Sequence, residues 1–394
     1  MAGFVLRLFV VGCWVTLGLV ISGNARVCLA QDDVPVMDAV SEVMGDFVRS
    51  GQIAGAVTVV TDDDSVLHLE AAGKARLSDG KPMQPDSLFW IASMTKPVTA
   101  VAVMILVEEE KLSLDDPITK HLPEMADLRT TDGKPATITI RQLLSHTSGM
   151  ADLPSESYLE ETLEAVARDF AKVEILFTPG SRWKYSQSGI NTAARIVEVV
   201  SEQPFDTFVQ RQILDPLEMN DTTFYPTDEQ ASRLAAAYRL RDGELAEVPI
   251  GLLQGLDITS RAHFPAGNGG LFSTGPDYAR FCQMLLGEGT RDGVQVLQPA
   301  SVQTMRSIVT GDLPTGFTPG NGWGVGVCVV RDPQGVSAAL SPGSYGHGGA
   351  YGTQAWIDPD RNRAYILMIQ RSDLPNSDAS AIRRKFQEAA STGS

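Results

Sequence analysis

The 394-residue chain contains little cysteine and histidine, with four and five residues respectively. Cys13 and Cys28 fall near the N-terminus, so the rest of the chain has only Cys282 and Cys328, each within an apolar stretch. Two thiols in such positions indicate buried side chains rather than a disulfide framework. The histidines show no metal-ligand spacing, and we expect neither a metal nor any other cofactor.

Basic residues are also scarce relative to acidic ones. Lys and Arg together number 32 and Asp and Glu 48, which gives a formal net charge of −16. Such a charge repels a phosphate backbone, so nucleic acid is not an expected partner. The composition is otherwise that of a globular protein, 43% hydrophobic and 20% charged, and fits one large domain or two closely packed ones.

The longest apolar run lies near the N-terminus. It covers residues 8–21, follows Arg7, and precedes the small residues near Ala30. This pattern predicts a signal peptide over residues 1–30 and a secreted or periplasmic protein; an uncleaved membrane anchor is the alternative. No other run reaches the length of a membrane span, so we expect no integral membrane domain after removal of the signal. The oligomeric state stays open.

Strand-like patterns occur near both ends of the chain. They cover residues 54–60 and 66–71, and return at 323–330, 354–357 and 364–370. Helices and loops fill most of the sequence between them. We therefore predict an α+β fold with one antiparallel sheet, built from the N- and C-terminal segments, flanking helices and an inserted, mainly helical region.

These patterns also predict the domain bounds. A single domain would cover residues 31–394. Its α/β part would span about 31–112 and 265–394, and its helical part about 113–264.

The spacing Ser-x-x-Lys occurs three times, and the copy formed by Ser93 and Lys96 has the most informative context. The copies that begin at Ser78 and Ser181 lie among turn-forming residues. Only the first is followed by a long apolar run, and a helix that is apolar on all sides is a buried one. The pattern predicts a buried helix over residues 93–109 with Ser93 at its start.

One helical turn separates Ser93 from Lys96, so the amine can reach the hydroxyl. Serine is a poor nucleophile unless a nearby base takes its proton, and lysine can act as that base when burial lowers its pKa. We interpret the pair as an activated nucleophile. The alternative is a helix-capping serine with a surface lysine.

Two further segments carry candidate chemistry. Tyr185 follows a Pro-Gly turn, and a phenol held between two cations can exist as a phenolate and act as a base. Otherwise it is a half-buried aromatic residue. Residues 345–352 are rich in glycine, which lets a backbone approach a ligand closely, and they include His347. We expect His146 to hold a loop together rather than to act in catalysis.

In order and spacing, these motifs resemble the class C β-lactamases and their relatives, the D-Ala-D-Ala carboxypeptidases and the family VIII carboxylesterases. No Ser-Asp-Asn motif of the class A enzymes occurs. Flanking segments such as 143–150 and 265–274 agree, so the resemblance covers nearly all of the chain after residue 30. The motifs that carry it are Ser93-Met94-Thr95-Lys96, Tyr185-Ser186-Gln187 and His347-Gly348-Gly349.

The resemblance implies a role for each matched residue. Ser93 would be the acylated nucleophile, Lys96 its activating group, and Tyr185 the base that relays a proton to the leaving group. The backbone amides of Ser93 and Ala350 would form the oxyanion hole. Gln187, His347, Gly348, Gly349 and Ala350 would line the substrate site.

Two departures from the family pattern bear on the substrate. Gln187 stands where asparagine is usual, and His347 replaces a permanent cation with a group that we expect to titrate near neutral pH. Both favour a small-molecule ester or amide as substrate over a carboxylate-bearing one. The alternatives are a β-lactamase or D-Ala-D-Ala carboxypeptidase, and a non-catalytic binding protein of the same fold. No Gly-x-Ser-x-Gly elbow of the α/β-hydrolases occurs.

Overall fold

The computed structural model describes residues 1, 3, 37–153, 162–316 and 318–392. The predicted signal peptide and the predicted domain start at residue 31 lie outside the described residues, apart from Met1 and Gly3. The bounds predicted for the α/β and helical parts stay predictions. No helix in the described part of the chain is both long and apolar enough to cross a membrane.

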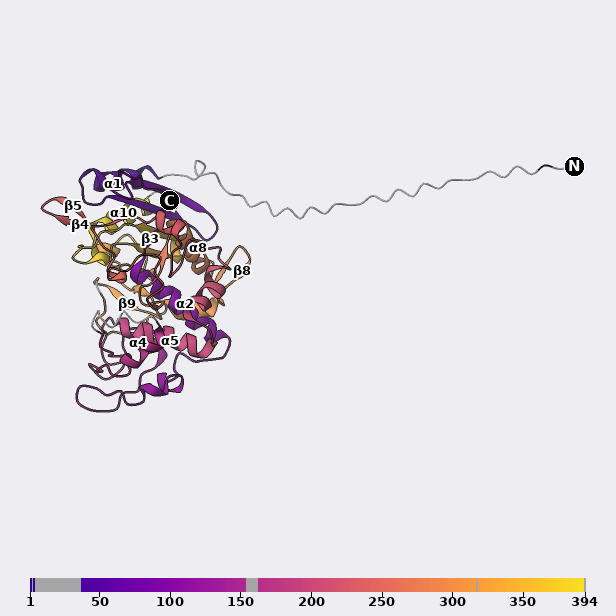
Figure 1. The fold of residues 1–394 in the computed structure, drawn as a ribbon, viewed down its shortest axis with the longest axis vertical. Coiled ribbons are helices and arrows are strands. Elements are labelled where there is room, and N and C mark those ends of the chain that lie inside the picture. Colours follow the sequence, from indigo (N-terminus) through magenta and orange to yellow (C-terminus); the bar gives the residue numbers. More distant parts are fainter. Residues whose placement is uncertain (2, 4–36, 154–161, 317, 393–394) are drawn as a thin grey trace. The chain divides into compact units, whose positions relative to one another are not determined.

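The main sheet has seven strands in the order β2-β1-β13-β12-β11-β10-β9, and every neighbouring pair is antiparallel. The first two strands lie beside the last one, so both ends of the chain build this sheet, as predicted (Figure 1). Its strands are β1 (Gly55–Thr61), β2 (Val66–Gly73), β9 (Asn321–Trp323), β10 (Cys328–Val330), β11 (Tyr345–Gly348), β12 (Gln354–Asp358) and β13 (Arg363–Met368).

Ten α-helices, three pairs of short strands and several 3₁₀ turns are the other main elements of the described residues. The pairs are β3 (Phe89–Trp90) with β6 (Phe272–Ser273), β4 (Ala237–Arg241) with β5 (Glu244–Val248), and β7 (Thr290–Arg291) with β8 (Val294–Gln295). The helices are α1 (Asp38–Arg49), α2 (Thr95–Glu108), α3 (Ile140–Leu144), α4 (Leu163–Phe170), α5 (Gln187–Ser201), α6 (Phe205–Val209), α7 (Asp228–Ser232), α8 (Gly275–Leu286), α9 (Pro299–Arg306) and α10 (Ala381–Thr392).

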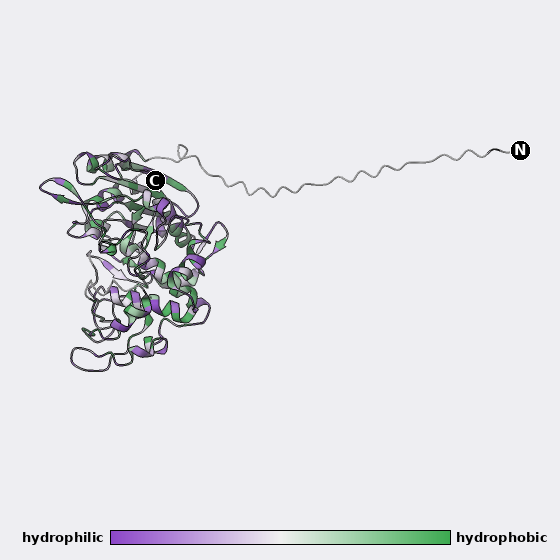
Figure 2. Ribbon diagram, in the orientation of Figure 1, coloured by the Kyte–Doolittle hydropathy of each residue, from purple (hydrophilic) through white to green (hydrophobic). Residues whose placement is uncertain are grey.

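Helices cover both faces of the sheet, which explains why β1 is buried throughout. Val57 and Val59 pack toward α8, whereas Ala56 and Val60 belong to the cluster that includes residues of α1 and α10. Since successive side chains of a strand point to opposite faces, a strand between two helical layers buries all of them. Figure 2 shows the resulting apolar strands beneath helices of mixed polarity.

Helix α2 runs through the core, and every residue from Thr95 to Leu106 is buried. It packs against α5, while the described helices α3, α4 and α6 also surround α5. The buried helix predicted over residues 93–109 is therefore confirmed, with one difference at its start. Ser93 lies in a single 3₁₀ turn, Ala92–Met94, that leads directly into α2.

The two cysteines of the described chain are also as predicted. Cys282 in α8 and Cys328 in β10 are free and buried. They belong to the clusters on opposite faces of the sheet, which accounts for two separate buried thiols.

The prediction of one strand over residues 323–330 is wrong. The segment forms a hairpin in which Trp323 of β9 pairs with Cys328 of β10. The turn requires Gly326, which has φ of +75° and whose added Cβ would lie 2.3 Å from Ala100 Cβ of α2. The apolar pattern concealed the turn because its residues are as buried as those of a strand.

We expect Gly326→Ala to lower the free energy of unfolding by about 2 kcal/mol or more, because strain at positive φ adds to the clash with Ala100. Gly293→Ala is the matched control, with φ of +77° and no atom within 4 Å of the added Cβ. Urea unfolding should show a loss of about 1 kcal/mol in the control, from backbone strain alone. Equal losses in the two variants would contradict the close packing of this turn on α2.

Candidate active site

Ser93 and Lys96 are in direct contact. Lys96 Nζ lies 3.0 Å from Ser93 Oγ and donates a 2.6 Å hydrogen bond to the backbone carbonyl of Asn268. Ala92, immediately before the serine, has φ of +46°, which non-glycine residues rarely adopt. Thr95 Oγ1 donates a 2.7 Å hydrogen bond to the Ala92 carbonyl and holds this turn. The Ser93 hydroxyl is therefore fixed within reach of the amine.

The environment of Lys96 favours its neutral form. The side chain is fully buried, and this burial lowers its pKa well below the ordinary value. The negative charges of Asp152 and Asp378 oppose the shift without reversing it. A neutral amine 3.0 Å from a hydroxyl can accept its proton.

His347 is a neutral imidazole in this site. Its Nδ1 lies 2.6 Å from the Gly348 carbonyl, which can only accept, so Nδ1 carries the proton and Nε2 is the acceptor. Its pKa is lowered to about 3, chiefly by burial. The expectation that His347 titrates near neutral pH is therefore wrong, because the sequence did not reveal its burial.

Tyr185 lies between these two groups. Its Oη is 3.4 Å from His347 Nε2, and Lys96 Nζ lies 4.6 Å from the centre of its ring. Burial raises its pKa well above the ordinary value, and a hydrogen bond with Ser93 opposes this only in part. The phenolate expected between two cations is thus contradicted: both neighbours are held neutral, and so is the phenol.

Gly348 and Gly349 are required by close packing. A Cβ on Gly348 would lie 2.0 Å from Asp378 Oδ1, and one on Gly349 would lie 2.0 Å from Thr353 Oγ1 and 2.6 Å from the Ile91 carbonyl. The end of β11 therefore lies directly against the chain that leads into the Ser93 turn. This approach brings the Ala350 backbone to the same recesses that Ser93 lines.

Two open recesses meet at Ser93, and they share Gln187 and Ala350 as well. The first, which we call the Asp152 recess, has a volume of about 350 Å³. The second, the Asp378 recess, has a volume of about 440 Å³. The Asp152 recess is also lined by Trp90, Ala92, Leu153, Gly251, Leu252, Gln254, Asn268 and Gly269, and the Asp378 recess by Tyr185, His347, Gly348, Gly349, Leu374, Pro375, Asn376 and Ser377.

Gln187 is joined to the Ser93–Lys96 pair through Asn268. The Asn268 side-chain amide donates a 2.9 Å hydrogen bond to Gln187 Oε1, while the Asn268 backbone carbonyl accepts from Lys96. The longer side chain of glutamine, which begins at the first residue of α5, spans the distance to this loop. All the predicted site residues are therefore brought together at the two recesses.

A family model described as Beta-lactamase matches residues 40–390. The chain belongs to the β-lactamase family. Protein Rv1367c of Mycobacterium tuberculosis is 35% identical over 366 residues, which cover 84% of this chain and 89% of that protein. Esterase EstB of Burkholderia gladioli is 30% identical over 358 residues, covering 83% and 88%. The solved structure of EstCE1, titled a hydrolase with promiscuous acyltransferase activity, matches with a TM-score of 0.77 at 26% identity and covers 91% of this chain and 98% of its own.

The β-lactamase family consists of serine hydrolases, and this chain is one of them. The polar residues of its site that were not predicted as site residues include Asp152, Asn268 and Asp378. Asn268 lies within the segment 265–274, which agrees with the family pattern, but nothing in the sequence predicted that it contacts Lys96 and Gln187. The two aspartates lie far apart in the sequence: Asp152 lies between α3 and α4, and Asp378 lies shortly before α10.

His146 has the structural position expected of it. Its ring is buried and lies 4.3 Å from the ring of Tyr185, measured between centres, and its Nδ1 accepts a hydrogen bond from the Ser186 backbone. The pKa of His146 is lowered well below the ordinary value, chiefly because the ring is buried. The neutral ring supports Tyr185 from behind and ties two loops together.

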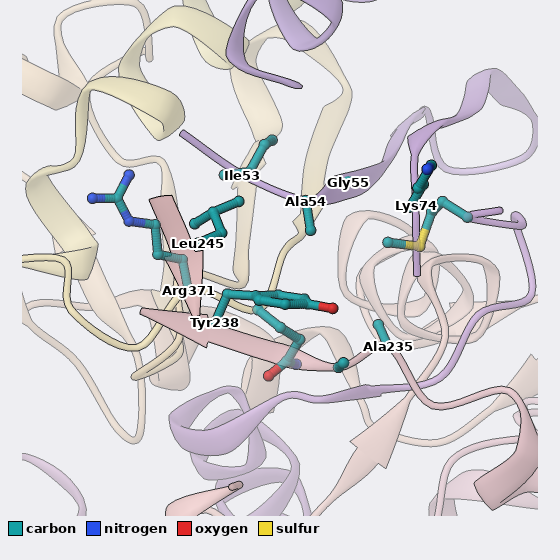
Figure 3. A pocket seen from close by; sticks show the side chains of 11 residues that line it. Ile53, Ala54, Gly55, Lys74, Ala235, Tyr238, Leu245 and Arg371 are labelled. Carbon is teal, nitrogen blue, oxygen red and sulfur yellow. The ribbon is translucent and has the colours of Figure 1, made fainter. Parts of the chain in front are cut away.

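A separate recess lies between β1 and the β4–β5 hairpin, where Tyr238 and Leu245 face Ile53 and Ala54 (Figure 3). Its volume of about 10 Å³ admits about one water molecule. Its lining includes no serine, cysteine or histidine. No cluster of three or more metal-ligating side chains occurs among the residues that the structure describes. The recesses at Ser93 are therefore the candidate site.

The buried neutral state of His347 predicts an acid-sensitive fold. Because its folded pKa of about 3 is below its ordinary value of 6.5, the unfolded chain binds more protons between these two pH values. Its contribution to stability is complete above pH 6.5 and is lost as the pH falls toward 3. When the pH falls from 7 to 4.5, the free energy of unfolding should decrease in both proteins. We expect this decrease to be about 2 kcal/mol smaller in His347→Gln than in the wild type. Urea titrations with identical pH dependence in both proteins would refute this.

Proposed function

We propose that this protein is a secreted serine hydrolase that forms an acyl-enzyme on Ser93 and hydrolyses esters or small amides. The observation that carries the proposal is the 3.0 Å contact between Ser93 Oγ and a fully buried Lys96 amine. The apolar run after Arg7 supports secretion through a signal peptide over residues 1–30.

The first half of the reaction uses the geometry around Ser93. Lys96 accepts the hydroxyl proton as Oγ attacks the substrate carbonyl, and the backbone amides of Ser93 and Ala350 stabilise the oxyanion by about 3 kcal/mol per donor. The proton then moves through the neutral Tyr185 hydroxyl to the leaving group, which departs as an alcohol or amine. The products of this half are the acyl-enzyme and the protonated leaving group.

The second half reverses these proton transfers with water. The same groups take a proton from a water molecule as it attacks the acyl carbonyl, and the oxyanion again forms between the two amides. When the tetrahedral intermediate collapses, the Ser93 oxygen leaves and regains its proton. The carboxylic acid is released and the starting state of the enzyme is restored.

The charges around Ser93 support an ester or small amide as substrate. Among the residues that line the two recesses, no arginine or lysine occurs, and His347 is neutral. A carboxylate on the substrate would therefore lack a cationic partner, and an unpaired charge in a recess is unfavourable. Two relatives are named as esterases, EstB and the lovastatin esterase of Penicillium rubens.

A β-lactamase or D-Ala-D-Ala carboxypeptidase is the second candidate. One relative, Penicillin-binding protein 4 of Amycolatopsis lactamdurans, is 33% identical over 303 residues, and these cover 76% of this chain and 75% of that protein. A non-catalytic binding protein is disfavoured by the retention of both Ser93 and Lys96 in contact.

Acylation should occur at Ser93 and depend on Lys96. Incubation with a fluorophosphonate should add one adduct mass in intact-protein mass spectrometry, located on Ser93 and absent from Ser93→Ala. Lys96→Met should slow acylation by about 10²-fold or more, since the general base is lost. Ser181→Ala and Lys184→Met alter another copy of the same spacing and should label at the wild-type rate. Equal labelling of wild type and Ser93→Ala would refute the proposed nucleophile.

Substrate preference separates the two candidate functions. We expect p-nitrophenyl butanoate to be hydrolysed with a kcat/KM at least 10-fold above that for a chromogenic cephalosporin, because the cephalosporin carboxylate finds no cation in either recess. The Ser93→Ala variant gives the background for both reactions. Rapid hydrolysis of the cephalosporin alone would exclude the esterase proposal in favour of the second candidate.

A further inference from the structure

Among the described residues that line the Asp152 recess, Asp152 is the one that carries a charge. Its position is fixed by the start of α5: Oδ1 accepts hydrogen bonds from the backbone amides of Gln187 and Ser188, at 2.6 and 3.0 Å, and from Ser186 Oγ at 3.2 Å. Among the described residues, no hydrogen bond or ion pair reaches Oδ2, and the residue is exposed. Asp152 therefore presents a held carboxylate oxygen beside Ser93.

The polar atoms around Asp152 do not neutralise it. Gln187 and Asn268 line the same recess, but the Asn268 side-chain amide is already donated to Gln187 Oε1. Asn268 Oδ1 is a buried acceptor with no hydrogen-bond partner among the described residues. Lys96 donates hydrogen bonds to Ser93 Oγ and to the Asn268 carbonyl. Because burial favours its neutral form, this amine does not neutralise Asp152. The described lining of the recess thus presents a negative charge, with no cation beside it, to a ligand.

The Asp378 recess also contains a negative charge, but a nearby arginine partly offsets it. Asp378 lines this recess, and the Arg383 side chain donates a hydrogen bond to the Asp378 backbone carbonyl. The Arg383 guanidinium also stacks on Trp356, with its central carbon 3.9 Å from the ring centre. The charge of Arg383 offsets that of Asp378. Asp152 has no ion-pair partner within the described chain, and its charge acts on Lys96 more strongly than that of Asp378 does.

We propose that Asp152 determines the charge of the substrate, so that the site selects esters or amides with a positive charge a few bonds from the scissile carbonyl and rejects those with a carboxylate there. This inference rests on the proposed hydrolysis at Ser93. An ammonium group in the recess gains the attraction of Asp152, whereas a carboxylate meets a like charge. The trimethylammonium and primary ammonium classes share this chemistry, since both carry one positive charge.

The test is a matched series of p-nitrophenyl esters: the cationic 4-(trimethylammonio)butanoate, its neutral isostere 5,5-dimethylhexanoate, and the anionic hemiglutarate. Each kcat/KM is divided by the rate constant for hydroxide hydrolysis of the same ester, which removes differences in intrinsic reactivity. We expect the corrected values to fall in the order cationic, neutral, anionic, with about 10-fold or more between the first and the last. Raising NaCl from 20 to 500 mM should reduce that ratio, since salt screens an exposed charge.

The variant Asp152→Asn keeps an acceptor oxygen for the start of α5 and removes the charge. We expect its cationic-to-anionic ratio to be at least about 3-fold smaller than that of the wild type. Asp312→Asn is the matched control: it removes one negative charge from a fully exposed residue that lines neither recess, and its ratio should equal that of the wild type.

The outcomes separate the inference from the function on which it rests. If no ester is hydrolysed and Ser93 is not labelled, the proposed function fails. If the esters are hydrolysed without a charge preference, or if the preference is unchanged in Asp152→Asn, the role of Asp152 is refuted and the hydrolase proposal stands. Should Asp152→Asn fold poorly, the wild-type charge order and its salt dependence decide the matter on their own.

Discussion

The burial of Lys96 is the constraint on which the rest of this site depends. A lysine in water is protonated at neutral pH and cannot take a proton from serine, so the chain must keep this amine out of solvent. Helix α2 does so because its residues from Thr95 to Leu106 are buried, and because the Asn268 carbonyl and Ser93 Oγ satisfy the amine. The cost of desolvating the group is offset elsewhere by the packing of a large apolar core around α2.

The same burial determines the state of its neighbours. Tyr185 lies next to Lys96 and His347 next to Tyr185, and the low-dielectric surroundings hold the phenol and the imidazole neutral as well. A proton can pass between neutral groups of this kind without creating a buried charge that persists. The carboxylates of Asp152 and Asp378 line the two recesses, and their negative charges oppose the lowering of the Lys96 pKa.

The site forms where three distant parts of the chain meet. The Ser93 turn begins α2, Tyr185 and Gln187 come from the start of α5, and His347 comes from β11 of the sheet. Close backbone contact joins them, as at Gly349, where a Cβ would meet the Ile91 carbonyl at 2.6 Å. Such contact fixes the Ala350 amide relative to Ser93 because neither backbone can move away from the other without breaking the sheet or α2.

The sequence by itself determined much of this protein. Apolar strand patterns at both ends of the chain indicated the antiparallel sheet, and an apolar run after Ser93 indicated the buried helix, because these patterns are local. Only the tertiary structure decided the hairpin at Gly326, the neutral state of His347 and the position of Asp152 beside Ser93. Each depends on which groups surround a residue in space, and burial and proximity between distant segments arise only when the chain has packed.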